Sequence, residues 1–174
     1  MTTEVSKKAG FKKKSKEDKS STSFSFRGNF EHNLDTKGRV SLPSYFRKIL
    51  QNLNQNSIVI TNYISDGMRC LEGFGIDSWV EFENKLKEKS RFSSKLQKLE
   101  NFYLSRATEC NIDASGRILI PSYLRDYASI NKNITFTSSI HGFRVWDTRV
   151  WNTVFNDAEQ ALINDPDLFS EVDL

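Results

Sequence analysis

The chain has 174 residues, enough for one or two small domains with a buried core. Its apolar fraction of 37% is typical of a globular protein, and no apolar run approaches the roughly 18 residues of a transmembrane helix. The net charge is +3, yet residues 1–22 alone carry +4, so the remainder carries about −1. The basic character therefore belongs to the N-terminal segment, and the rest of the chain is not a general attractor of polyanions.

The N-terminal segment, residues 1–25, is rich in Lys and Ser and poor in large apolar residues, which predicts a disordered basic tail. Two interpretations of it stay open: a solvated leader, or an arm that binds phosphates non-specifically. It lacks the apolar region of a secretory signal. The widely spaced Cys70 and Cys110 do not indicate a disulfide framework, and with His32 and His141 they lack zinc-ligand spacing. A reducing cytoplasm is expected.

The first predicted element in chain order is a β-hairpin over residues 29–42. Apolar residues at Phe30 and Leu34 are separated by polar ones, and Asp35 to Gly38 is a turn signal. Pro43 ends the second strand and suits the start of a helix, whose apolar face runs from position 46 to position 53.

Further strands are predicted at 57–61 and 70–74, which completes a first unit at 29–76. A capping box at Ser78 and Glu81 predicts the next helix, and a second helical stretch follows at 93–103. These helices form a predicted helical connector over residues 77–106.

The order of elements then begins again. Residues 113–125 repeat residues 35–47 with a shift of 78, and seven of the thirteen positions are identical, which we interpret as an internal repeat. The identical pairs are Asp35 and Asp113, Gly38 and Gly116, Arg39 and Arg117, Pro43 and Pro121, Ser44 and Ser122, Tyr45 and Tyr123, and Arg47 and Arg125.

The second unit is predicted at 107–150, with a hairpin, a helix opened by Pro121 and two further strands. A closing helix and a tail occupy 151–174. Each unit alone has too little core, so the two should pack about a pseudo-two-fold axis. The fold class predicted is therefore α+β, β-dominated, with short helices.

Each repeat places Asp-x-x-Gly-Arg at a predicted hairpin tip. The Asp accepts backbone hydrogen bonds and pairs with the Arg, while Gly38 and Gly116 let the chain reverse. Arg39, with Lys37 beside it, and Arg117 should then lie on exposed tips on a common side. Such tips suit phosphate contacts and bidentate readout of guanine in the major groove. The alternative is purely structural: the Asp ties the Arg to stiffen the turn.

Catalysis is not indicated by the sequence, which lacks a Gly-rich phosphate loop, a metal-ligand cluster and a nucleophile motif. Asp35 and Asp113 each precede an Arg by four residues, which keeps them ionised and argues against an acid–base pair. We therefore predict no enzyme, no cofactor, no metal site and no small-molecule substrate. The aromatic residues Tyr45, Tyr123, Trp79 and Trp151 fall on apolar faces and are interpreted as core or subunit contacts.

Four stretches of the sequence form a recognisable pattern: Phe26-Arg27-Gly28, the run from Asn33 to Pro43, the second run from Ala107 to Pro121, and Phe143-x-x-Trp146. In these stretches the chain resembles the MraZ family of bacterial transcriptional regulators. The resemblance covers about residues 26–165. It implies tandem AbrB/SpoVT-like units that form a pseudo-two-fold swapped-hairpin β-barrel.

The resemblance also implies a function. Family members form closed rings, of the octamer or dodecamer class, and bind short direct repeats of double-stranded DNA. These lie in the promoter of the division and cell-wall gene cluster, including their own operon, and the expected action is repression at the nucleoid in the cytoplasm. The DNA-binding residues implied are Arg39, Lys37, Arg117 and Arg27.

Two features depart from the family pattern. A Lys-rich leader precedes the Phe-Arg-Gly segment, and the second tip has Ser115 where the first has Lys37, which predicts unequal contributions of the two tips. The alternative function is a protein-interaction module of the antitoxin type with the same fold. The duplicated unit and the amphipathic closing helix argue against it.

Overall fold

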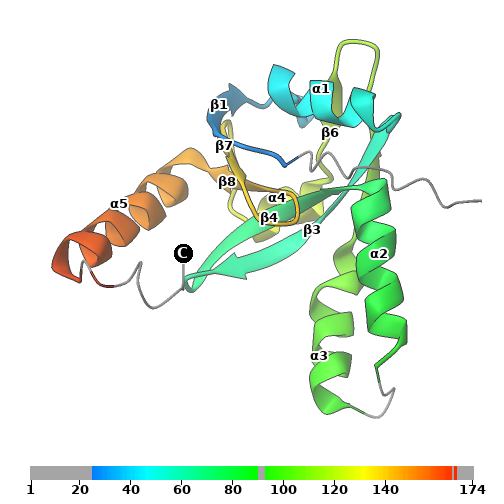
Figure 1. Cartoon of the computed structure of the whole chain (residues 1–174). Helices are drawn as coiled ribbons and strands as arrows, with labels where there is room; N and C mark the ends of the chain where they lie inside the picture. Colours follow the sequence, from blue (N-terminus) through cyan, green and yellow to red (C-terminus); the bar gives the residue numbers. More distant parts are fainter. Residues whose placement is uncertain (1–24, 90–92, 166, 168–174) are drawn as a thin grey trace, which may run out of the picture.

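The computed structural model of the protein describes residues 25–89, 93–165 and 167. The predicted disordered tail lies outside these residues, except for Ser25. Antiparallel sheets and five α-helices make up the described part of the chain (Figure 1), which confirms the α+β class. None of the helices in these ranges is long and apolar enough to span a membrane.

The larger sheet has six antiparallel strands drawn from both repeats. In spatial order they are β1 (Asn29–Asn33), β7 (Asn133–Ser138), β8 (Phe143–Asp147), β4 (Met68–Gly75), β3 (Ser57–Ser65) and β5 (Thr108–Asn111). Strands from the first repeat therefore pair with strands from the second at three places along the sheet, so the two repeats share one sheet.

The smaller sheet is a two-stranded ribbon of β2 (Arg39–Ser41) and β6 (Arg117–Leu119). The two predicted hairpins are wrong in their strand pairing, because β1 pairs with β7 and β2 pairs with β6. The predicted turn does form: the Gly38 N–H donates to the Asp35 carbonyl at 3.0 Å, and the Asp35 N–H donates to the Arg39 carbonyl at 2.8 Å. A three-residue strand has few hydrogen bonds of its own, so burying Val40 against Ile118 decides its partner.

The helices follow the predicted order. They are α1 (Ser44–Asn52), α2 (Ile76–Lys87), α3 (Ser94–Phe102), a 3-10 turn (Leu104–Arg106), α4 (Ser122–Tyr127) and α5 (Thr148–Asn164). The predicted capping box is wrong, because α2 begins two residues before Ser78 and Gly75 is its N-cap. The buried Gln55 side chain caps it instead: its Oε1 accepts from the Ile76 N–H at 3.0 Å.

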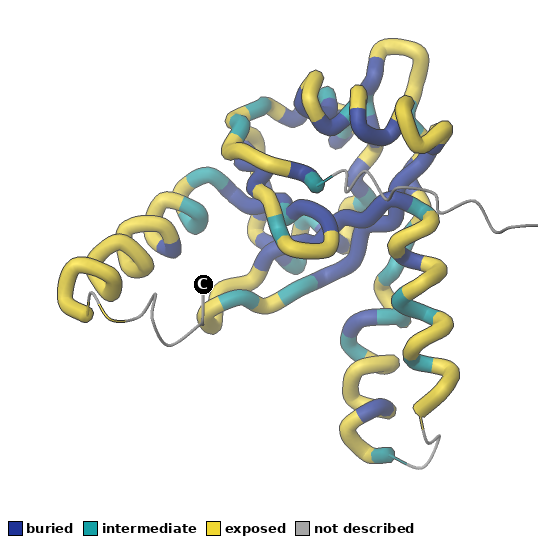
Figure 2. The backbone as a smooth tube through the Cα atoms, viewed as in Figure 1, coloured by how far each residue is buried: buried dark blue, intermediate teal, exposed yellow. Residues whose placement is uncertain are grey.

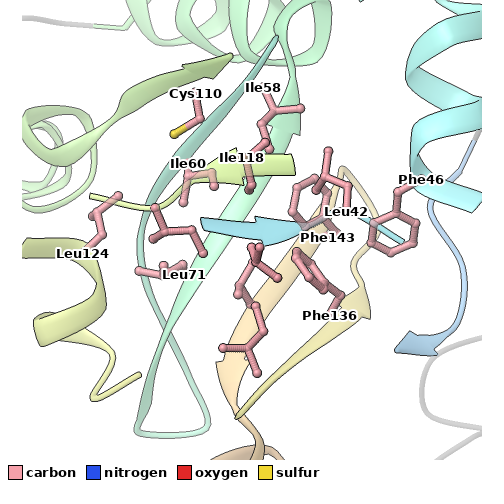
Figure 3. Close-up of a cluster of buried hydrophobic side chains, with 14 of the residues drawn as sticks. Leu42, Phe46, Ile58, Ile60, Leu71, Cys110, Ile118, Leu124, Phe136 and Phe143 are labelled. Carbon is pink, nitrogen blue, oxygen red and sulfur yellow. The ribbon is translucent and has the colours of Figure 1, made fainter. Parts of the chain in front are cut away.

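The main core lies between one face of the large sheet and the layer formed by the ribbon with α1 and α4. Figure 3 shows Leu42 and Ile118 from the ribbon region meeting Phe136 and Phe143 from the sheet. Two smaller clusters cover the opposite face, one beneath α2 and α3 and one beneath the start of α5. Beyond its first turns α5 projects from the sheet, and its distal half is exposed (Figure 2).

Candidate nucleic-acid interface

The β2–β6 ribbon has one buried face and one outer face. Its register pairs Arg39 with Leu119, Val40 with Ile118, and Ser41 with Arg117. Val40 and Ile118 are each 1% exposed and point into the core. Because side chains alternate along a strand, Arg39 and Arg117 both lie on the outer face, from opposite strands.

An aspartate organises each turn. In the first, Asp35 Oδ1 accepts from the backbone N–H groups of Lys37 and Arg39, both at 2.9 Å, and Oδ2 lies 2.7 Å from Arg39 Nε and from its Nη2. In the second, Asp113 accepts in the same way from Ser115 at 2.8 Å and from Arg117 at 2.9 Å. Each aspartate therefore ties the arginine of its own turn, as the repeated Asp and Arg predict.

The same ion pairs leave part of each guanidinium available. Both arginines bind their aspartate through Nε and Nη2, and within the described ranges no hydrogen bond engages Nη1. The Arg39 and Arg117 side chains remain 36% and 35% exposed. The aspartates thus fix the orientation of two arginines whose other edge is accessible, and the structural and DNA-contact interpretations are compatible.

The backbone hydrogen bond from Arg39 is the largest influence that lowers the pKa of Asp35, from 3.8 to about 2, and the Arg39 side chain adds to it. The backbone N–H of Arg117 likewise lowers the pKa of Asp113. Both aspartates are therefore ionised at physiological pH, and each neutralises much of its own arginine's charge. A net positive surface needs further cations.

Arg47 and Arg125 are two further cations that lie next to the turns, and our sequence interpretation gave them no role. A Cβ atom at Gly38 would lie 2.9 Å from Arg125 Cζ, and one at Gly116 would lie 2.4 Å from Arg47 Nη1. Each turn therefore packs on a guanidinium from the other repeat. The repeat itself points to these arginines, since Arg47 and Arg125 are its last identical pair. Their contacts could not be predicted from the repeat, because each arginine packs against the turn of the other repeat.

Of the other two predicted DNA-binding residues, Lys37 lies next to the outer face of the ribbon and Arg27 does not join it. Lys37 is exposed within the first turn, where the second turn has Ser115. Arg27 is exposed just before β1, and in the described residues no hydrogen bond or ion pair links it to either turn. The structure thus brings Lys37, Arg39 and Arg117 to the ribbon but does not join Arg27 to them.

The four aromatic residues divide into two pairs. Trp79 is buried in the cluster beneath α2 and α3, and Trp151 packs, partly buried, on the separate cluster beneath the start of α5, as predicted. Tyr45 and Tyr123 are 39% exposed at equivalent positions of α1 and α4, so they are not core residues, and their role as subunit contacts stays a prediction. The Tyr123 hydroxyl contacts the Thr108 hydroxyl, and the Arg106 guanidinium carbon lies 5.3 Å from the Tyr123 ring centroid.

A pocket of about 570 Å³ lies apart from the ribbon, and no residue of either turn lines it. Inside it the Tyr103 hydroxyl donates to buried Glu72, and Ser139 donates to the same carboxylate at 3.5 Å. Burial, followed by the Glu72 charge, raises the pKa of Tyr103, so the phenol stays protonated at neutral pH. The Tyr103 phenol therefore serves as a hydrogen-bond donor to Glu72 and is not a poised base.

The two cysteines, like Tyr103, are buried. Burial raises the pKa of Cys70 to about 12 and that of Cys110 to about 11, so both free thiols are protonated. In the part of the chain that the structure describes, no three His, Cys, Asp or Glu side chains gather as a metal site would require.

Residues 25–101 and 103–167 match the family model MraZ, described as "MraZ protein, putative antitoxin-like". The Transcriptional regulator MraZ of Syntrophobacter fumaroxidans (strain DSM 10017 / MPOB) is 34% identical over 127 residues, which are 73% of this chain and 82% of that protein. This is a family of transcriptional regulators and not of enzymes. The family match covers most of the chain in two segments, and the chain therefore belongs to the MraZ family, with two MraZ repeats.

Proposed function

We propose that this protein is a transcriptional regulator that binds double-stranded DNA through the outer face of the β2–β6 ribbon. The observation that carries the proposal is the placement of Arg39 and Arg117 on one exposed face, each oriented by an aspartate. A two-stranded ribbon fits the major groove, and an arginine edge matches the O6 and N7 atoms of guanine. Lys37, Arg47 and Arg125 add the charge that attracts the phosphates.

The finer features follow the family. The targets are short direct repeats in the promoter of the division and cell-wall gene cluster, including the protein's own operon, and the action is repression at the nucleoid. The pairing of β1 with β7 and of β2 with β6 supports a swapped-hairpin β-barrel. The predicted domain division stays part of the proposal, and the two family segments meet inside the predicted connector at 77–106.

The proposed assembly is a closed ring of the octamer or dodecamer class. One subunit presents few cationic groups on its ribbon, so it would bind weakly alone. Repeating the ribbon around a ring, on tandem DNA repeats, raises affinity through effective concentration without any new contact. The uncovered distal half of α5 supports contacts between subunits.

Replacing Arg39 tests the DNA face. Arg39→Ala should weaken binding to the protein's own promoter by about 5- to 150-fold, the discrimination of one bidentate arginine–guanine contact. Arg117→Ala should weaken it less, because the second turn has Ser115 in place of Lys37. Fluorescence anisotropy at two salt concentrations measures both effects.

Arg149→Ala is the matched control, because Arg149 is also an exposed arginine paired with an aspartate, Asp147. It should bind DNA normally. Normal binding by Arg39→Ala, with its oligomer intact on a sizing column, would contradict the assignment of the ribbon to DNA. The alternative function, an interaction module of the antitoxin type, would instead retain a stoichiometric protein partner and no DNA.

A further inference from the structure

Leu119 is an apolar side chain on the charged outer face of the ribbon. It lies directly opposite Arg39 across the two strands and two residues after Arg117 on its own strand. Its exposed fraction is 54%, whereas Val40 and Ile118 on the other face of the ribbon are 1% exposed. Opposite residues in such a pair have Cβ atoms about 5 Å apart, so Leu119 stands beside the Arg39 guanidinium stem.

The equivalent residue in the first repeat is polar. The shift of 78 residues places Ser41 at the position of Leu119, and Ser41 lies on the same outer face, opposite Arg117. The two halves of the face therefore match in their arginines but differ at this position. Leu119 is not among the residues of the hydrophobic core clusters, and the exposed part of its apolar surface would be buried only by a contact outside the subunit.

In the major groove the apolar feature of a base pair is the C5-methyl group of thymine, while the neighbouring base edges carry hydrogen-bonding groups. A leucine that neighbours both proposed guanine-reading arginines, Arg39 across the strands and Arg117 along its own strand, has the right chemistry and position to meet such a methyl group. We propose that Leu119 contacts a thymine methyl group next to the bases read by the arginines, so that the second repeat prefers thymine there. This rests on the proposed DNA-binding function.

The corresponding position of the first repeat should behave differently. The Ser41 hydroxyl can donate to or accept from any base edge and gives little preference for a methyl group. The two repeats then read different sequences with the same backbone. This difference sets the orientation of each subunit on a direct repeat, which an identical pair of half-faces would not do.

The experiment begins with full-length protein and a pool of randomised duplexes, from which bound sequences are selected. In the best duplex each thymine is replaced in turn by deoxyuridine, which removes the methyl group and keeps the base pairing. Wild type should bind about fourfold more weakly at one position, the effect of losing one buried methyl group. Leu119→Ser should be insensitive there, and Leu119→Ile should stay sensitive. Ser41→Leu should gain a second sensitive position.

Two results would overturn the inference. One is an equal loss for wild type and Leu119→Ser at every deoxyuridine, which would leave the DNA-binding proposal intact. The other is a change in oligomeric mass of Leu119→Ser by light scattering, which would make Leu119 a subunit contact. If wild type selects no sequence and Arg39→Ala behaves like wild type, the proposed function itself fails.

Discussion

Asp35 uses both carboxylate oxygens on its own turn, with Oδ1 on two backbone amides and Oδ2 on Arg39. The carboxylate therefore fixes the backbone and orients the side chain that we assign to DNA. An asparagine in its place could still accept the backbone hydrogen bonds of the turn but would lose the ion pair with Arg39. In the proposed DNA contact, stability and recognition therefore depend on the same atoms of Asp35 and Arg39.

The lowered pKa of Asp35 gives a prediction about pH. A folded-state pKa of about 2, below the ordinary 3.8, means that the ionised carboxylate stabilises the fold above about pH 4 and that this is lost as the pH falls toward 2. Asp35→Asn should therefore have a lower urea midpoint than wild type at pH 7. The difference should persist to about pH 4 and then narrow.

Urea unfolding followed by circular dichroism between pH 7 and pH 3 measures this difference. Asp157→Asn is the control, because Asp157 is an exposed aspartate of α5 that forms no ion pair with any other residue in the described ranges. Its midpoint should follow wild type throughout. A gap between Asp35→Asn and wild type that widens on acidification would contradict the role given to the carboxylate.

At the scale of the element, each turn needs a glycine in the left-handed region and a guanidinium beneath it. Gly38 has a φ of +80° and faces Arg125, and Gly116 has a φ of +73° and faces Arg47. The turn that one repeat forms is thus supported by the helix of the other repeat. This exchange explains why a short ribbon with few hydrogen bonds of its own holds a defined position.

Gly38→Ala separates backbone strain from this packing. Alanine in the left-handed region costs roughly 1–2 kcal/mol, and its Cβ would also displace the Arg125 guanidinium. Gly67 is the matched control, because its φ is +74° and a Cβ there would meet nothing within 4 Å. Gly38→Ala should lose at least as much stability in urea as Gly67→Ala, and only Gly38→Ala should weaken DNA binding. Equal DNA binding by Gly38→Ala and Gly67→Ala would show that the packing of Arg125 against the first turn does not contribute to DNA binding.

At the scale of the whole molecule, α5 is anchored only at its start. Trp151 packs on Trp146 with ring centroids 5.7 Å apart, and Phe155 follows at 5.9 Å from Trp151. After Val154 every described residue of the helix is exposed, including Phe155, Leu162 and Ile163. An isolated half-helix of this length is marginal in water, so this surface fits a contact with a neighbouring subunit.

Phe155→Asp tests this contact. Phe155 is 50% exposed, so the charge should leave the subunit folded, while the oligomeric mass by light scattering should fall and DNA affinity should fall with it. Gln160→Asp adds the same charge about 140° around the helix and should leave the mass unchanged. An unchanged mass for Phe155→Asp would remove α5 from the proposed ring interface.

Much of the fold could be predicted because the relevant patterns are local. The positions of the strands and helices follow from apolar periodicity and from Gly and Pro, and the aspartate turns follow from interactions within five residues. The helix start at Ile76 could not be predicted, because the group that caps it belongs to Gln55, 21 residues away.

The duplication, the two Asp and Arg turns, the α+β class and the likeness to a regulator family could be predicted from the amino-acid order, because each depends on nearby residues or on the order of motifs. The pairing of β2 with β6, the support of the opposite turns by Arg47 and Arg125, and the common face of Leu119 and both arginines became visible in the three-dimensional fold alone. These features join segments about 78 residues apart. The β2 and β6 strands pair because this arrangement buries Val40 and Ile118 together. Such a contact between distant segments is not encoded in local periodicity.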